Sequence, residues 1–301
     1  FRRPWPKYGA IGRIMQCEYY LPGAGNSAMT LYNGIRNIDH PVIASRDLDV
    51  TRQQFERLGF TVPPRGSHIE WGTGNLCIMF PDDYLEVRGI IDPEKFTMHL
   101  DSHLEKHGEG LMGVAFGTAD VEASYAEAQA NGINTGELRS LRRNFEHPEG
   151  WTQPAFSLFS PDADDIEGLM HVVVIQHLTP ELIRRPDFLE HANGCTGISA
   201  MTGTVSDIGS SVAKMRRLLG DAAVTETEEG VRLAVPSGQV ITLAGGETTA
   251  LESMAMRVAD VTATTEYFES NNISFDRNSD GSIAIAPEDA CGTRLVFAEA
   301  T

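Results

Sequence analysis

Two residues of the N-terminal half, Glu86 and His68, have types and positions that could do chemistry. Glu86 lies inside an apolar segment with the pattern of a buried strand. An unpaired carboxylate in such a place is unfavourable by several kcal/mol. Glu86 therefore requires a bound cation, an arginine partner such as Arg88 or Arg142, or contact with solvent. His68 stands just before a glycine-rich turn, and its imidazole could bind a metal or transfer protons near neutral pH.

A second group of histidines has regular spacing. His99, His103 and His107 are four residues apart within a helix predicted over Lys95–His107. This spacing places the three rings on one helix face, as in some metal sites. We interpret the face as solvated rather than as a site.

Other reactive motifs are missing from the sequence. Gly72-Thr73-Gly74 is not followed by the helix that a dinucleotide-binding turn requires, and Gly209-Ser210-Ser211 lacks the glycine-lysine pair of a phosphate-binding loop. There is no Gly-x-Ser-x-Gly nucleophile elbow. The cysteines are far apart and form no CxxC pair: Cys17, Cys77, Cys195 and Cys291. Reduced thiols of a cytoplasmic protein are therefore expected.

The elements that must position the candidate residues form a repeat. Four times the sequence shows an apolar strand, a turn with an aspartate, an amphipathic helix and two or three short strands. The turn aspartates are Asp47, Asp120, Asp207 and Asp260. An aspartate at a helix N-cap accepts backbone N–H groups and complements the helix dipole. One βαβββ unit leaves a sheet face uncovered, so the units must pair.

The repeat predicts an α+β protein of four βαβββ modules paired into two domains. We place these domains at residues 29–178 and 195–301, with a proline-containing linker at 179–194. Residues 1–28 are basic and aromatic and do not fit the repeat, so we interpret them as an N-terminal arm.

The composition limits the partners. The 301 residues include 24 basic and 42 acidic side chains, for a formal net charge of −18. Such a polyanion repels nucleic acid and anionic membrane surfaces. No apolar run approaches the roughly 18 residues of a membrane helix. We expect a cytoplasmic protein with a small-molecule partner and neither a nucleic-acid nor a membrane partner.

Several motifs give the repeat a family resemblance. They are Ile38-Asp39-His40, Gly66-Ser67-His68 with the turn at 72–75, and Tyr84-Leu85-Glu86, together with the linker sequence from Gln176 to Gly194. With the paired modules they resemble the vicinal oxygen chelate superfamily, in particular its glyoxalase-like proteins. The superfamily includes isomerases, lyases, ring-cleaving dioxygenases and resistance proteins that sequester small molecules. The resemblance therefore predicts a fold more narrowly than a reaction.

The resemblance also implies a metal site. Divalent transition metals such as Fe, Mn, Zn, Ni or Co would bind ligands from the first and last strands of each module. His40 matches the first-strand ligand and Glu86 the last-strand carboxylate. The second module departs from this pattern: aligning the turn aspartates places Gly113 at the position of His40, and Val173 stands at that of Glu86.

A third ligand must then come from a displaced position. Strand alternation places His171 and His177 on the same face as Val173. We favour His40, Glu86 and His171 as the ligand set, with His177 or His68 as alternatives to His171. His68 and Glu86 are the candidate catalytic residues.

Two functions remain open at this point. The first is a divalent-metal-dependent enzyme of the lyase, isomerase or dioxygenase type, acting on a small organic substrate with vicinal oxygens. The second is a metal-free protein that binds or sequesters a small molecule, in a pocket lined by Trp71, Phe80, Tyr84 and Trp151. The missing ligand at Gly113 favours the second.

The C-terminal half is expected to carry no site of this kind. Residues 195–301 contain no histidine. We therefore interpret them as a degenerate domain that supports folding or a homodimer contact, and place any active site in the N-terminal half.

Overall fold

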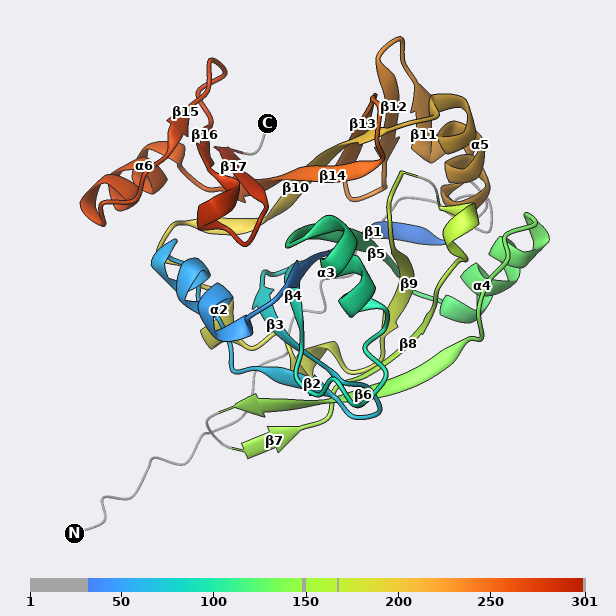
Figure 1. The fold of residues 1–301 in the computed structure, drawn as a ribbon, viewed down its shortest axis with the longest axis horizontal. Helices are drawn as coiled ribbons and strands as arrows, with labels where there is room; N and C mark the ends of the chain where they lie inside the picture. The colour runs from blue at the N-terminus through green and yellow to red at the C-terminus, as the bar shows by residue number, and fades with distance from the viewer. Residues whose placement is uncertain (1–31, 148–149, 167, 300–301) are drawn as a thin grey trace, which may run out of the picture.

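The computed structural model describes residues 32–147, 150–166 and 168–299, so the predicted arm at 1–28 lies outside the described residues. In this part of the chain, two mixed β-sheets and five α-helices form an α+β structure (Figure 1). No helix in the described ranges has the length and apolar character needed to cross a membrane.

Aspartate caps start four of the helices. Asp47, Asp120, Asp207 and Asp260 are extended in backbone conformation, and each side chain accepts one or two N–H groups of the first turn. The helices that follow are α2 (Leu48–Arg57), α4 (Val121–Ala130), α5 (Ile208–Leu219) and α6 (Val261–Ser270). The four-fold repeat predicted from these aspartates is therefore confirmed.

The first sheet contains the strands of the first two modules. They are β1 (Ile35–Ser45), β2 (Gly66–His68), β3 (Thr73–Met79), β4 (Tyr84–Ile90), β5 (Gly110–Thr118), β6 (Arg139–His147), β7 (Gly150–Thr152), β8 (Ala155–Phe159) and β9 (Val172–His177). Their order is β2-β3-β4-β1-β5-β9-β8-β6-β7. An additional pairing of β2 with β6 closes this sheet into a barrel.

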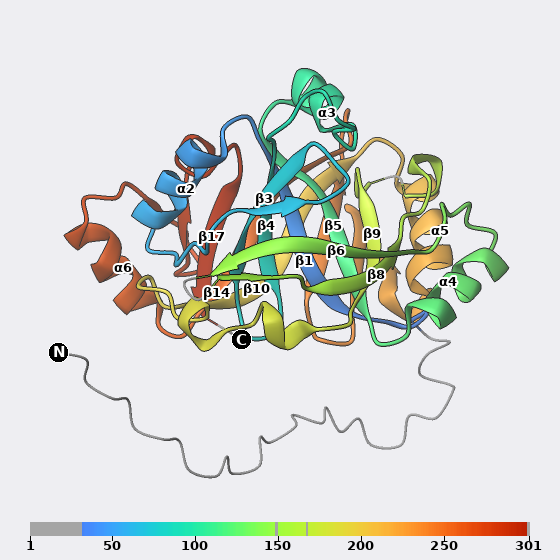
Figure 2. The same cartoon turned by 90° about the horizontal axis from the view of Figure 1, so that it is seen from below.

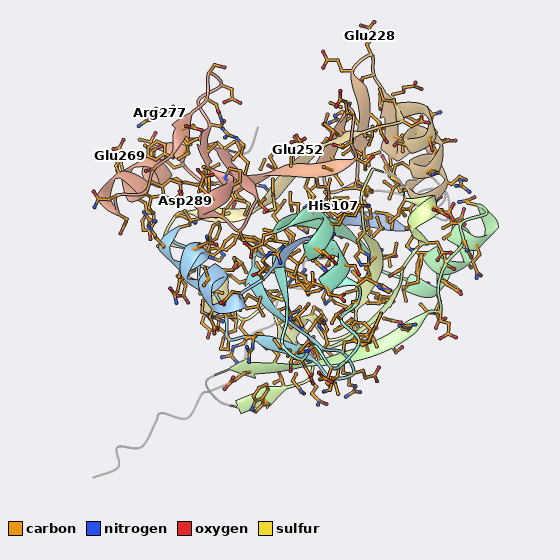
Figure 3. All side chains as sticks on the ribbon, in the orientation of Figure 1. His107, Glu228, Glu252, Glu269, Arg277 and Asp289 are labelled. Carbon is orange, nitrogen blue, oxygen red and sulfur yellow. The ribbon has the colours of Figure 1, made fainter. Side chains whose placement is uncertain are left out.

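The second sheet contains the last two modules and has no such closing pair among its described strands. The strands are β10 (Cys195–Val205), β11 (Val224–Glu226), β12 (Gly230–Ala234), β13 (Val240–Gly245), β14 (Ala250–Val258), β15 (Asp276–Arg277), β16 (Ile283–Ile285) and β17 (Arg294–Glu299). Acidic side chains such as Glu228 and Glu269 project from the edges of this half (Figure 3).

The two sheets repeat the same backbone irregularities. In the β1–β5 pair the register shifts between Ile38 and His40, and in the β10–β14 pair it shifts between Ile198 and Ala200. Helices from the two halves lie beside each other, α2 with α6 and α4 with α5 (Figures 1 and 2). The two domains, each built from two paired modules, thus pack against each other through these helices and through their central strands.

The structure differs from the sequence expectations at the helix α3 and at the strands β6, β7 and β9. The helix α3 comprises Leu100–His107 instead of Lys95–His107, because Met98 and His99 have left-handed backbone conformations that a helix cannot include. The strand β9 begins at Val172, so His171 lies just outside it. The strands β6 and β7 were not predicted at all.

Candidate active site

The N-terminal barrel encloses a cavity of about 230 Å³. Its lining includes the five histidines His40, His68, His99, His171 and His177, and the arginines Arg88, Arg139 and Arg143. The predicted ligand and catalytic residues His40, His68, Glu86 and His171 therefore all line one cavity. Three residues in or beside the lining, Met98, His99 and Met170, have φ angles of 58°, 61° and 61°. Left-handed non-glycine residues are uncommon and often occur at binding sites.

Strand pairing brings His40 and Glu86 together. The parallel pair β1–β4 aligns Val42 with Glu86, two residues from His40 along the strand. His40 Nε2 lies 3.4 Å from Glu86 Oε2, and both side chains are buried. The His40 ring also stacks on Tyr84, with 4.2 Å between ring centroids.

Asp39 holds two of the histidines. Its Oδ1 lies 2.8 Å from His40 Nδ1 and 3.0 Å from His177 Nε2. In a regular strand the side chains of Asp39 and His40 would point to opposite faces. The β-bulge between Ile38 and His40 allows the two side chains to contact each other. Burial raises the pKa of Asp39, but His177 and His40 outweigh it and hold the pKa well below its usual range. Because ionised Asp39 can only accept, His40 Nδ1 must carry a proton.

Glu86 is neutralised by protein groups. Its Oε2 accepts a hydrogen bond from Arg88 Nη2 at 2.8 Å and its Oε1 accepts one from Asn75 Nδ2 at 2.8 Å. Arg143 Nη1 in turn donates to Asn75 Oδ1 at 3.0 Å. Burial raises the pKa of Glu86, but Arg88 and His40 keep it well below the usual value. The arginine partner anticipated from the sequence is therefore Arg88, while Arg142 is exposed.

His40 and His68 are driven toward opposite protonation states. Burial lowers the pKa of His40, but Asp39 and Glu86 more than offset this and raise it above the usual value. Burial, with Arg88 and Arg143 nearby, lowers the pKa of His68 to about 4. His68 Nδ1 lies 3.2 Å from the carbonyl oxygen of Thr73, which can only accept, and 2.8 Å from its hydroxyl. His68 Nδ1 therefore carries the proton and Nε2 keeps its lone pair.

His171 owes its position to Gly113. A Cβ atom on Gly113 would collide with the backbone oxygen and Cβ of His171. The His171 side chain lines the cavity together with Val173, Ile175 and His177, as strand alternation predicts. Burial and Arg88 lower the pKa of His171 to about 4. Its Nε2 atom is buried and has no hydrogen-bond partner in the described part of the chain.

Comparison with known proteins identifies the family. The model of the glyoxalase-like domain matches residues 38–219, from β1 to the end of α5. The chain belongs to the glyoxalase-like domain family. No curated protein matches the sequence.

Solved structures share the fold of this glyoxalase-like protein at low identity. A hypothetical protein from Staphylococcus aureus matches with a TM-score of 0.68 and 16% identity, over 87% of this chain and 99% of that one. A mutant of 4-hydroxymandelate synthase from Streptomyces coelicolor matches with a TM-score of 0.58 and 12% identity, over 88% of this chain and 92% of that one.

A third match is to a larger protein. A xylose isomerase-like TIM barrel/4-hydroxyphenylpyruvate dioxygenase fusion protein gives a TM-score of 0.55 at 14% identity, over 90% of this chain and 50% of that one. These structures share the vicinal oxygen chelate fold with this chain. At such identities the likeness concerns the fold alone.

Within this glyoxalase-like chain, only the first module has ligand-type residues at the equivalent strand positions. Counted back from each turn aspartate, the places equivalent to His40 hold Gly113, Ala200 and Ser253. The places equivalent to Glu86, found from the parallel pairs, hold Val173, Thr242 and Val296. The site chemistry is therefore concentrated in one of four repeats.

The donor groups do not fit a three-ligand metal site as they stand. Both oxygens of Glu86 are occupied by Arg88 and Asn75, and a guanidinium on the carboxylate repels a second cation. No group of three His, Cys, Asp or Glu side chains in the described ranges is arranged to hold a metal ion. Glu86 is therefore not free to bind a metal in this arrangement.

Some expected residues lie elsewhere. Phe80 is fully buried in the main core and Trp151 is 63% exposed on β7, so neither lines the cavity, whereas Trp71 and Tyr84 do. Of the three evenly spaced histidines, His99 and His107 are exposed, as expected, and His103 is half-buried. His99 lies at the N-cap of α3 rather than within the helix, and it also lines the cavity.

Asp39, Asn75 and Arg143 were missed as site residues. Asp39 adjoins His40 in sequence, but its role depends on the bulge. Arg143 lies on the unpredicted strand β6, on the same face as Leu141 and Phe145. These two apolar residues are separated by three polar ones, so the segment has no clear apolar–polar alternation that would predict a strand.

Proposed function

We propose that the N-terminal cavity is the active site of an enzyme that transfers protons on a small organic substrate with vicinal oxygens, in the manner of a lyase or isomerase. The observation that supports this most directly is the pair His40 and His68. Both line one cavity, and their surroundings shift their pKa values in opposite directions. Such divergence assigns an acid and a base in proton-transfer enzymes.

The roles follow from the hydrogen bonds. Neutral His68 accepts a proton at Nε2 from the carbon beside a substrate carbonyl, because its Nδ1–H is held by Thr73. Protonated His40 donates its Nε2 proton to the substrate oxygen, while Asp39 fixes the ring through Nδ1. The substrate leaves the step as an enediol, with one proton moved to His68 and one from His40. Return of the two protons at exchanged positions completes an isomerisation.

Exchange with solvent deuterium tests this proposal. The purified chain would be incubated in D₂O with hydroxyketones and dicarbonyls, and loss of the carbon-bound proton followed by NMR. We expect exchange with at least one substrate and its loss by about 10²-fold or more in His68→Gln and His40→Asn. His107→Gln on the exposed end of α3 is the matched control and should exchange like the wild type. Equal exchange in all four proteins would refute the assignment.

Metal dependence is a separate part of the hypothesis. The family resemblance implies a divalent transition metal at His40, Glu86 and His171, and the partnerless Nε2 of His171 is the feature in its favour. The Arg88–Glu86 ion pair is the feature against it. Metal analysis of untagged protein, compared with the His40→Ala variant, distinguishes a metal-bound site from one in which Arg88 is the partner of Glu86.

Binding without turnover is the second candidate function. The Glu86 carboxylate is already satisfied by hydrogen bonds from Arg88 and Asn75. Trp71, Phe96 and Phe156 contribute apolar surface to the cavity lining. Saturable small-molecule binding with no proton exchange in any substrate would favour sequestration over catalysis.

A further inference from the structure

Two buried nitrogen atoms of the cavity have no hydrogen-bond partner. In the described residues, seven buried side-chain polar atoms lack a partner, and only Arg88 Nε and His171 Nε2 belong to the cavity lining. A buried polar atom without a partner is unfavourable, and a native protein usually satisfies it with water or a ligand. Their coincidence in one cavity therefore indicates a missing ligand group.

Both atoms can act as hydrogen-bond donors. Arg88 Nε–H can only donate, and the neutral His171 ring can present Nε2 as a donor as well. The two residues line the same cavity. Two donors fit the two oxygens of a carboxylate better than they fit a neutral carbonyl or an amine.

Arg88 still has capacity for a second anion. Its Nη2 donates to Glu86 at 2.8 Å, but this uses only one corner of the guanidinium fork. Arg143 adds a second buried guanidinium to the lining. A ligand carboxylate would therefore enter a cavity in which Arg88 and Arg143 already balance the negative charge of Glu86.

Part of the cavity lining is apolar. Phe96 belongs to the lining and is 52% exposed, so it lies at the mouth. Trp71 packs against His68 at 5.3 Å between ring centroids and is partly exposed. A ligand whose charged end reaches Arg88 would hold its other end against these rings.

We infer that the cavity binds a small organic carboxylate with an apolar tail, the carboxylate accepting from Arg88 Nε and His171 Nε2 and the tail lying against Trp71 and Phe96. This inference rests on the proposed function because it concerns the same cavity. It assigns to Arg88 the role of the resident cation beside Glu86.

The test is calorimetric binding of phenylacetate to the full chain, compared with the neutral isostere phenylacetamide. We expect phenylacetate to bind about tenfold or more tightly than the amide. Arg88→Lys keeps a cation beside Glu86 but lacks Nε–H, and should weaken phenylacetate binding about tenfold without changing amide binding. His171→Leu should do the same. Arg232→Lys and His107→Gln, both exposed, are matched controls with no expected change.

Three outcomes would overturn the inference: equal binding of acid and amide, no binding of either, or unchanged acid affinity in both cavity variants. The His171 variant decides the matter if Arg88→Lys fails to fold, which circular dichroism would reveal. Failure of the proposed function is separable, because proton exchange with no inhibition by phenylacetate refutes only the carboxylate subsite. Acid-selective binding with no exchange refutes only the catalysis.

Discussion

Asp39 connects His40 to His177 through a single carboxylate oxygen, at 2.8 Å and 3.0 Å. His40 lies on β1 of the first module and His177 at the end of β9 in the second. The two repeats of the barrel therefore meet at one ionised side chain.

Replacement of Asp39 by Asn should lower the pKa of His40. The carboxylate is the main group that raises this pKa against the effect of burial. NMR titration of the His40 ring should show its transition at lower pH in the variant than in the wild type. An unchanged His40 transition would contradict the hydrogen bond from His40 to Asp39.

Glu86→Gln should destabilise the chain strongly. The substitution leaves Arg88 as a buried charge without its carboxylate, which typically costs about 3–5 kcal/mol. Urea unfolding provides the measurement, with Glu105→Gln on the exposed face of α3 as the control. The double variant Glu86→Gln/Arg88→Gln should recover part of the loss, and a loss below about 1 kcal/mol in the single variant would indicate a solvated pair.

Gly113→Ala should disturb both stability and the cavity. The added Cβ collides with the backbone of His171, so β5 or the segment before β9 must shift. We expect a loss of about 1–3 kcal/mol in urea unfolding. Gly209→Ala is a suitable control, because its Cβ would lie at an ordinary 3.6 Å from Asp207 and a helix gains from alanine.

Asp83 should make stability depend on pH. Burial raises its pKa to about 7 from 3.8, despite a hydrogen bond from Ile198. A folded-state pKa above the unfolded value means that the folded protein binds the proton more tightly. The resulting stability is complete below about pH 4 and is lost as the pH rises through 7.

The size of this effect has an upper limit. One pKa unit corresponds to about 1.4 kcal/mol, so the loss from Asp83 is at most roughly 4 kcal/mol between about pH 4 and pH 8. Urea unfolding across this range should show the loss in the wild type and much less of it in Asp83→Asn. Parallel curves would show that the pKa of Asp83 is the same in the folded and unfolded states.

Metal content provides the last prediction. Because Glu86 is occupied by Arg88 and Asn75, protein purified without tag or chelator should hold well below one equivalent of Fe, Mn, Zn, Ni or Co. Chelation should then leave the melting temperature unchanged. One equivalent of a metal that is lost in His40→Ala would instead establish the ligand set implied by the family resemblance.

Much of the fold could be predicted because its signals are local. Each turn aspartate caps the helix that follows it, so Asp47, Asp120, Asp207 and Asp260 mark the four modules. The proximity of His40 and Glu86 also follows from the module, since the first and last strands of a βαβββ unit pair in parallel.

The rest depends on contacts that no local pattern contains. Arg143 reaches Asn75, 68 residues away along the chain, because β6 pairs with β2, which in turn pairs with β3. His171 lies on the face that strand alternation predicts but just outside β9, and its close contact there depends on the absence of a Cβ atom on Gly113. The role of Asp39 depends on the β-bulge between Ile38 and His40. The equivalent bulge in the second sheet, between Ile198 and Ala200, has no histidine beside it.

Gln239, just before β13 in the turn between β12 and β13, holds the bulge of β1 from the other half of the molecule. Its Oε1 accepts from Ile38 N at 2.8 Å, and its Nε2 donates to Ile38 O at 3.1 Å and to Asp83 at 3.0 Å. A chain ending after His177 would retain every side chain on which the proposed chemistry depends and lose the amide that shapes their backbone. The half without histidines thus shapes the backbone of the reactive half, so the proposed site requires both halves of the chain.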